Sequence, residues 1–183
     1  ITKELLKTAD ETRKLTKIKF DNVPAKLLGI EGEAAEPMKK TFTKSVICLA
    51  NEMVGGAERV REDALEYVKM RMQFGRSIAS FQVIKHKATD MLANVELAKS
   101  AAYFAAAAFD DEDKETEEAA SIAKAAASEA YMQTAIQSIQ MHGGIGFTWD
   151  NDTHLWFKRA KSSEVFLGTS NYHREIMMNI WDI

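Results

Sequence analysis

Long, nearly unbroken stretches of helical periodicity constrain the fold of this chain more than any other feature of its sequence. From residue 42 to residue 72, for example, apolar side chains recur at intervals of three and four residues. The 183 residues include only two prolines and nine glycines, so few positions interrupt such patterns. We therefore predict an all-α fold, an up-and-down four-helix bundle with an extra short C-terminal helix, preceded by a short β segment. The sequence turns helical at about Pro37, and the apolar spacing of the first helix runs over residues 42–72. The other expected helices cover residues 80–109, 117–142, 151–162 and 171–181.

The N-terminal part of the chain carries a different pattern. Apolar or β-branched residues alternate with lysines from Thr16 to Phe20, as in a half-exposed strand. One or two strands do not make a stable sheet, so we expect the other strands to be absent from the sequence. We predict two units: residues 1–35 as the end of a β-domain with its linker, and residues 36–183 as a helical bundle domain. Because the chain begins at Ile1, we expect it to belong to a longer protein.

Composition and charge exclude several classes of function. Basic and acidic residues are mixed and the net charge is −3, so we expect no nucleic-acid partner. No apolar run has the length of a membrane-spanning helix, and we expect no span. The histidines lack the i, i+4 spacing of zinc sites, so we predict no metal site. The single cysteine, Cys48, fits a cytoplasmic location, and its apolar neighbours predict a buried position.

A pair of glycines, Gly55 and Gly56, lies inside the first predicted helix. Glycine in a helix interior costs about 1 kcal/mol relative to alanine. We expect the close approach of another helix to compensate for this cost.

Three loops interrupt the helices, and each combines glycine with polar or aromatic residues. The first contains Arg71, Phe74, Gly75 and Arg76. An arginine guanidinium can pair with phosphate oxygens, and the phenylalanine could lie against a planar ring. A surface arginine and a core phenylalanine at a helix junction would give the same pattern, and spacing alone favours that second interpretation.

The second loop, from Gln140 to Phe147, contains three glycines, which let backbone amides approach an anion. A helix end followed by a turn also explains these glycines, and His142 is better explained as structural. The third loop precedes the last helix, where we expect Ser170 to be the N-cap. Free amides at a helix N-terminus can bind an anion, but an ordinary capped helix has the same sequence.

The three loops occur in a fixed order along the chain. The first comprises Arg71 to Gly75 and is followed by Phe81-Gln82, the second runs from Gln140 to Phe147, and the third contains Leu167-Gly168-Thr169. This order and these distances resemble the acyl-CoA dehydrogenase family, in which Arg-x-x-Phe-Gly, Phe-Gln, Gln-x-x-Gly-Gly-x-Gly-Phe and Glu-Gly-Thr follow one another. Each motif alone is weakly specific, whereas three in register over nearly the whole chain are specific. The resemblance implies the family's C-terminal helical domain, with residues 10–30 similar to the last strand of its middle β-domain.

The resemblance also implies a cofactor site. In the family, FAD lies between domains and across a subunit boundary of a tetramer. Six residues would contact the flavin nucleotide of the neighbouring subunit, namely Arg71, Phe74, Gln82, Gln140, Gly143 and Gly144. Thr169 and Asn171 would contact the flavin held by this subunit.

The reaction that the resemblance implies is the α,β-dehydrogenation of an acyl-CoA thioester. A carboxylate base would remove an α-proton, and a hydride would pass from the β-carbon to the flavin. An electron-transfer flavoprotein would then reoxidise the flavin.

Two positions that carry the base in members of the family hold no carboxylate here. One is Leu167, directly before Gly-Thr, and the other is about Ser45 on the first helix. An arginine that often follows the second position is replaced by Val46.

Glu164 is the nearest carboxylate to the first of these positions, and it is our candidate for the catalytic base. An ion pair of Glu164 with Lys161 or Arg159 explains this residue better. Glu52 and Glu58 are weaker candidates, because we expect their helical phase to differ from that of the second position.

The segments Met141 to Trp149 and Tyr172 to Arg174 resemble a branch of the family that often lacks the glutamate and forms unequal pairs. A homo-tetramer and a hetero-tetramer with a paralogous subunit both remain open. So do a catalytic subunit whose base lies elsewhere, a non-catalytic FAD-holding subunit, a flavin-free helical interaction module and a related flavin oxidase.

Overall fold

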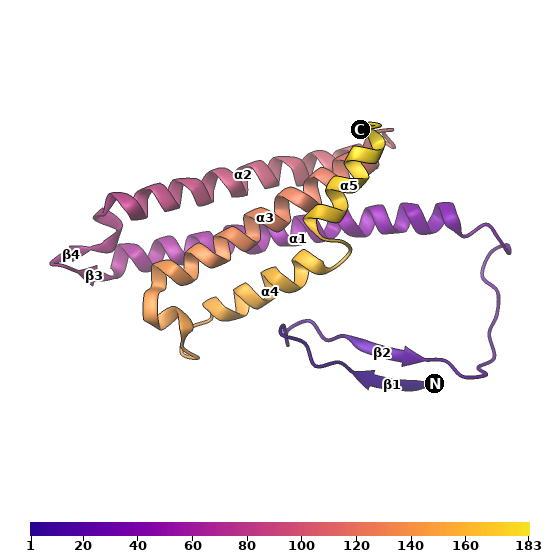
Figure 1. Ribbon diagram of the computed structural model, residues 1–183, viewed down its shortest axis with the longest axis horizontal. Helices are drawn as coiled ribbons and strands as arrows, with labels where there is room; N and C mark the ends of the chain where they lie inside the picture. Colours follow the sequence, from indigo (N-terminus) through magenta and orange to yellow (C-terminus); the bar gives the residue numbers. More distant parts are fainter.

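Five α-helices dominate the computed structural model, which describes residues 1–183. The helices are α1 (Ala35–Met70), α2 (Gln82–Asp110), α3 (Thr116–His142), α4 (Thr153–Val165) and α5 (Ser170–Ile180). Short 3-10 helices cover Ile78–Ser80 and Gly143–Phe147, and the strands are β1 (Thr2–Leu5), β2 (Thr16–Lys19), β3 (Met72–Gln73) and β4 (Arg76–Ser77). Figure 1 shows the three long helices side by side, with α4 along them and α5 at one end. The predicted helical bundle is confirmed.

The helix boundaries lie within about three residues of the expected ones. We expected helical sequence from about Pro37, and α1 begins at Ala35. Proline at position 37 does not prevent this, because the amide of a residue in the first turn has no partner within the helix. Glu117 and Glu118 lie in the first turn of α3, where the helix dipole favours negative charge.

The N-terminal residues form a β-hairpin. β2 is the strand predicted from the alternation after Thr16, and it pairs antiparallel with β1, which we did not predict. The register places Thr2 opposite Lys19 and Leu5 opposite Thr16. All residues of both strands are exposed. The division of the chain at residue 35 stays a prediction.

A buried ion pair fastens the hairpin to the bundle. Asp10 is 2% exposed, and its Oδ2 accepts a hydrogen bond of 2.7 Å from Nε of Arg159 on α4. Arg13 forms an ion pair with Glu52 on α1. Burial by itself would raise the pKa of Asp10, but hydrogen bonds from Thr12 and Arg159 hold it below its ordinary value. Arg159 is thus the partner of Asp10 and not of Glu164.

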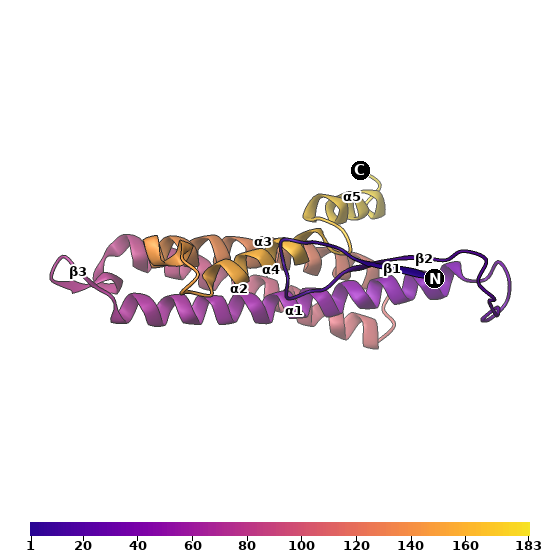
Figure 2. The same ribbon diagram turned by 90° about the horizontal axis from the view of Figure 1, so that it is seen from below.

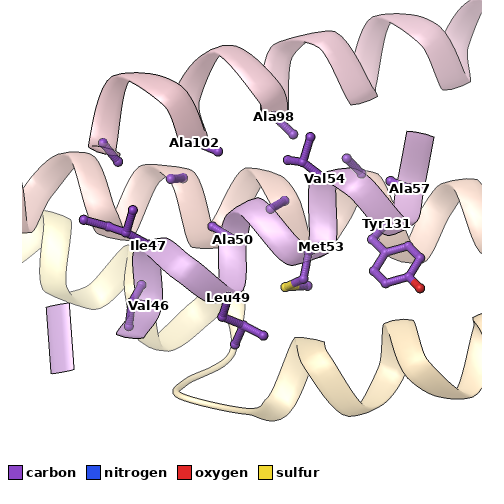
Figure 3. Close-up of a cluster of buried hydrophobic side chains, with 14 of the residues drawn as sticks. Val46, Ile47, Leu49, Ala50, Met53, Val54, Ala57, Ala98, Ala102 and Tyr131 are labelled. Carbon is purple, nitrogen blue, oxygen red and sulfur yellow. The ribbon is translucent and has the colours of Figure 1, made fainter. Parts of the chain in front are cut away.

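The core lies between the three long helices and consists largely of small side chains. Figure 3 shows Val46, Ala50, Met53 and Ala57 of α1 pointing toward their neighbours in the core. Alanines of α2 and α3 face them, so the helices can approach closely and pack densely. Each fully buried valine or methionine contributes about 1.5–3 kcal/mol of transfer free energy.

The glycine pair in α1 separates into two cases. A Cβ at Gly56 would lie 2.7 Å from Cζ of Tyr131 on α3, whereas nothing lies within 4 Å of a Cβ at Gly55. The expectation of a close approach is confirmed for Gly56 and wrong for Gly55.

None of the helices combines the length and the apolar character that a crossing of the bilayer requires.

Candidate functional site

A tight turn between β3 and β4 forms the first predicted loop. Phe74 and Gly75 connect the two strands with φ angles of 54° and 76°. A left-handed φ is natural for glycine but strained for phenylalanine. Phe74 is 89% exposed. Its ring makes a T-shaped contact with the ring of Phe81, with 6.0 Å between the centroids. The turn therefore holds an aromatic ring outside the bundle, and Phe74 is not a core residue.

The polar residues around this turn are open to a ligand. Arg71 caps α1 through its backbone N–H, which donates to the carbonyl of Tyr67 at 2.9 Å. Its side chain is exposed and forms no ion pair or hydrogen bond within the chain. Gln82 is the first residue of α2 and is also exposed. The Arg76 guanidinium, by contrast, lies over the ring of Phe81, 4.0 Å from its centroid.

The glycine loop follows α3 directly. Gly143 has a φ of 62°, and the chain then turns through the 3-10 helix Gly143–Phe147. Gln140 and Gly144 are exposed, and a Cβ at Gly144 would meet nothing within 4 Å. His142 is buried, and its Nδ1 lies 2.8 Å from the carbonyl oxygen of Ser138. His142 therefore has the structural surroundings that we expected.

The first two loops lie at the same end of the bundle. The ring of Tyr67, near the end of α1, is stacked on that of His142, the last residue of α3. Figures 1 and 2 both show the β3–β4 turn and the end of α3 at this end of the molecule. The fold thus gathers six predicted residues there, Arg71, Phe74, Gln82, Gln140, Gly143 and Gly144.

The third segment lies elsewhere. In both ribbon views, the link between α4 and α5 is far from the β3–β4 turn. Thr169 is the N-cap of α5, and its hydroxyl accepts a hydrogen bond of 3.3 Å from the Tyr172 amide. Our prediction of Ser170 as N-cap is wrong by one residue, because Ser170 already lies in the helix. Thr169 and Asn171 are exposed, so a ligand can reach them.

The two positions without a carboxylate meet in one open pocket. Ser45 on α1 and Leu167 in the link line a hollow of about 450 Å³ together with Phe166. The Ser45 hydroxyl donates to the carbonyl of Thr41 at 2.8 Å. Cys48 also lines the pocket and is exposed, so our prediction of a buried cysteine is wrong. The apolar neighbours of Cys48 in sequence occupy the core-facing side of α1, and Cys48 lies on the other side.

One carboxylate lines this pocket, and it is Glu52. We expected its helical phase to differ from that of Ser45, which is wrong because seven residues make about two helical turns. Glu52 Oε1 accepts from Arg13 and from Arg159, while Oε2 has no hydrogen bond within the chain. Glu164 is absent from the lining, and its Oε2 lies 2.6 Å from Nζ of Lys161.

Comparison with known proteins gives the family. Residues 35–180 match the family model described as acyl-CoA dehydrogenase, C-terminal domain. The chain belongs to the acyl-CoA dehydrogenase family. The resemblance seen in the three loops is therefore confirmed.

Three relatives illustrate the range of similarity. The chain is 35% identical over 176 residues to acyl-CoA dehydrogenase IpdE2 of Mycobacterium tuberculosis, covering 96% of this chain and 51% of that protein. It is 31% identical over 138 residues to subunit CarC of the caffeyl-CoA reductase-Etf complex of Acetobacterium woodii, covering 75% of this chain and 36% of that subunit. Its structure is similar to that of butyryl-CoA dehydrogenase from Megasphaera elsdenii, with a TM-score of 0.90, 27% identity, and coverage of 100% of this chain and 49% of that one. The chain spans about half the length, or less, of these relatives.

Proposed function

We propose that this chain is the C-terminal part of an acyl-CoA dehydrogenase subunit and takes part in the FAD-dependent α,β-dehydrogenation of an acyl-CoA thioester. The observation that carries the proposal is the pocket that Ser45 and Leu167 line together. These are the two positions at which members of the family hold the base. Leu167 lies two residues before Thr169 in the sequence.

The residues that are present fit FAD. The exposed ring of Phe74 can lie against a planar group, and the unpaired Arg71 guanidinium can bind a pyrophosphate oxygen. Open space around Gly144 lets a ligand approach the backbone. When bound, FAD would accept the hydride from the β-carbon of the substrate.

The separation of the two groups of residues favours an oligomer. Arg71 and its neighbours lie at one end of the bundle, and Thr169 and Asn171 lie far from them. A flavin that contacts both groups would then be shared by two subunits. We therefore propose a homo- or hetero-tetramer in which each flavin bridges two chains, with an electron-transfer flavoprotein as the partner that reoxidises it.

Two carboxylates are candidates for the base. Glu52 lines the pocket, and its free Oε2 could take the α-proton. Glu164 lies outside the lining and is held by Lys161, so the substrate would have to displace that ion pair. We propose Glu52 over Glu164, and the pair of variants Glu52→Gln and Glu164→Gln separates them.

A second candidate function is a non-catalytic subunit that holds FAD for a partner. The observation that favours it is the replacement of both base positions by Ser45 and Leu167, with Glu52 engaged by two arginines. Such a chain would still need the flavin-contacting residues at both of its sites.

The deciding experiment is an anaerobic titration of the full-length protein with any subunit that co-purifies. Flavin absorbance is recorded while butyryl-CoA, octanoyl-CoA and bulkier acyl-CoAs are added. Bleaching that is lost in Glu52→Gln supports the catalytic subunit. Flavin that bleaches only after a paralogous subunit is added supports the FAD-holding role. An assembly that cannot be loaded with FAD contradicts both and leaves a flavin-free interaction module.

A further inference from the structure

A lysine lies at zero exposure in the interior of the bundle. Lys124 of α3 directs its ammonium group at the link between α4 and α5. Its Nζ donates to the carbonyl oxygens of Glu164 at 3.1 Å and Gly168 at 2.9 Å, and to Oγ of Ser128 at 3.0 Å. A buried charge is costly unless it is hydrogen-bonded, and these three acceptors use all three donors of the ammonium. Lys124 therefore joins α3 to both ends of the link.

A buried histidine holds the middle of the same link. His173 of α5 is 1% exposed, and its Nε2 lies 2.9 Å from the carbonyl oxygen of Leu167. A carbonyl can only accept, so Nε2 carries the proton and donates. In the neutral ring, Nδ1 then accepts from the Ser121 hydroxyl, 3.4 Å away. Burial lowers the pKa of His173, which favours this neutral form.

The link has a backbone conformation that needs such support. Leu167 has a φ of 57°, a left-handed value that costs a residue with a side chain about 1–2 kcal/mol. Gly168 follows with a φ of 103°, and a Cβ there would lie 2.4 Å from Cδ1 of Tyr172. The carbonyl of Glu164 near the end of α4 and those of Leu167 and Gly168 in the link are thus fixed by side chains of α3 and α5.

A lysine is not the simplest way to fill this space. An apolar side chain of the same length would avoid the cost of burying a charge, and such replacements are often neutral or stabilising. It would, however, leave the carbonyl groups of Glu164 and Gly168 without the donors that Lys124 supplies, and the link would lose the contacts that fix its conformation. The directional contacts of Lys124 point to a need for the link to keep one conformation.

We propose that Lys124 and His173 are positioning residues, which hold the link so that Leu167 faces the pocket and Thr169 and Asn171 face the flavin of their own subunit. This inference rests on the proposed function, because it assigns the link to flavin contact. It goes beyond that function by naming two residues that touch neither substrate nor cofactor.

The test uses the full-length protein with its co-purifying subunit. Lys124→Met keeps the length of the side chain and removes the donors. Lys114→Met, an exposed lysine just before α3, is the matched control. Ser121→Ala is a milder second variant, because it removes only the partner of the His173 Nδ1 atom. It tests the inference if Lys124→Met does not fold. FAD affinity and amide hydrogen exchange are measured at a temperature at which the variants remain folded.

We expect Lys124→Met to bind FAD at least tenfold more weakly and to exchange faster at residues 164–171 but not in α1 or α2. Ser121→Ala should show a smaller change, about threefold, in the same segment, and Lys114→Met none. Faster exchange in the link with unchanged FAD affinity overturns the inference. So does faster exchange spread over the whole bundle, which would indicate a merely structural role. Wild-type protein that cannot be loaded with FAD instead contradicts the proposed function itself.

Discussion

The ring of Tyr67 is stacked on the imidazole of His142, with 4.1 Å between centroids and 22° between ring planes. Tyr67 is near the end of α1 and His142 is the last residue of α3, so the stack joins the two loops that hold the six predicted flavin contacts. The Tyr67 hydroxyl also donates to the His142 carbonyl at 3.4 Å.

We expect Tyr67→Leu to lower the stability of the protein and to weaken FAD binding. Loss of an aromatic pair costs about 0.5–1.5 kcal/mol beyond the buried area. The measurement is urea unfolding together with FAD titration of the full-length protein. Tyr67→Phe is the control, because it keeps the stack and loses only a long hydrogen bond. Equal FAD affinity in Tyr67→Leu and Tyr67→Phe would show that the stack does not position the loops.

The two adjacent glycines of α1 offer a matched pair of variants. Gly56→Ala would place a methyl group 2.7 Å from the buried Tyr131 ring, and we expect a loss of about 1–3 kcal/mol in stability. Gly55→Ala meets nothing and should gain up to about 1 kcal/mol from helix propensity. Thermal unfolding of both variants checks the sign of each change. Stabilisation by Gly56→Ala would show that α1 and α3 are less closely packed.

Much of the fold could be predicted because helical periodicity and glycine positions are local signals. The three interrupting loops and the strand after Thr16 come directly from such patterns. β1 was missed because its sequence, Thr2 to Leu5, has no strand alternation of its own and is fixed by pairing with β2. Cys48 was misjudged because its sequence neighbours are apolar, whereas exposure depends on which side of α1 faces the core.

The candidate site was predictable only where a motif marked it. The flavin loops follow from motifs, but the pocket depends on the folding of the link against α1 and on the place of Glu52 two turns from Ser45. The role of Lys124 was also not predicted, although a single lysine between alanines in a predicted core helix indicates a buried charge that needs partners. Its three partners come from tertiary contacts that no local pattern contains.

The pocket predicts the effect of restoring a carboxylate at position 167. Leu167→Glu adds no new backbone strain relative to leucine, and Arg13 and Lys44 in the lining would stabilise the negative charge. If the wild-type chain lacks a base, FAD-loaded Leu167→Glu should be bleached by acyl-CoA at least about 100-fold faster, as expected for general-base catalysis. Leu167→Gln has a similar shape and no base, and it should stay at the wild-type rate. In a Glu52→Gln background, bleaching of Leu167→Glu no faster than that of Leu167→Gln would argue against this pocket as the reaction site.

Burial makes the stability of the protein depend on pH through Lys124. Desolvation lowers the pKa of this lysine to about 8 from its ordinary value of 10.5, against opposition from the Glu164 carboxylate. Between these two values the unfolded chain binds the proton and the folded chain does not, so stability rises with pH. Below pH 8 both states bind it and the contribution is constant.

The prediction is a difference between wild type and Lys124→Met measured by urea unfolding at several pH values. From about pH 8 to 10.5 the wild-type protein should gain stability relative to the variant, by at most about 1.4 kcal/mol per pH unit. Lys114→Met should follow the wild type, because its side chain is exposed. A difference that stays flat or falls over this range would mean that burial does not lower the pKa of Lys124 in the folded protein.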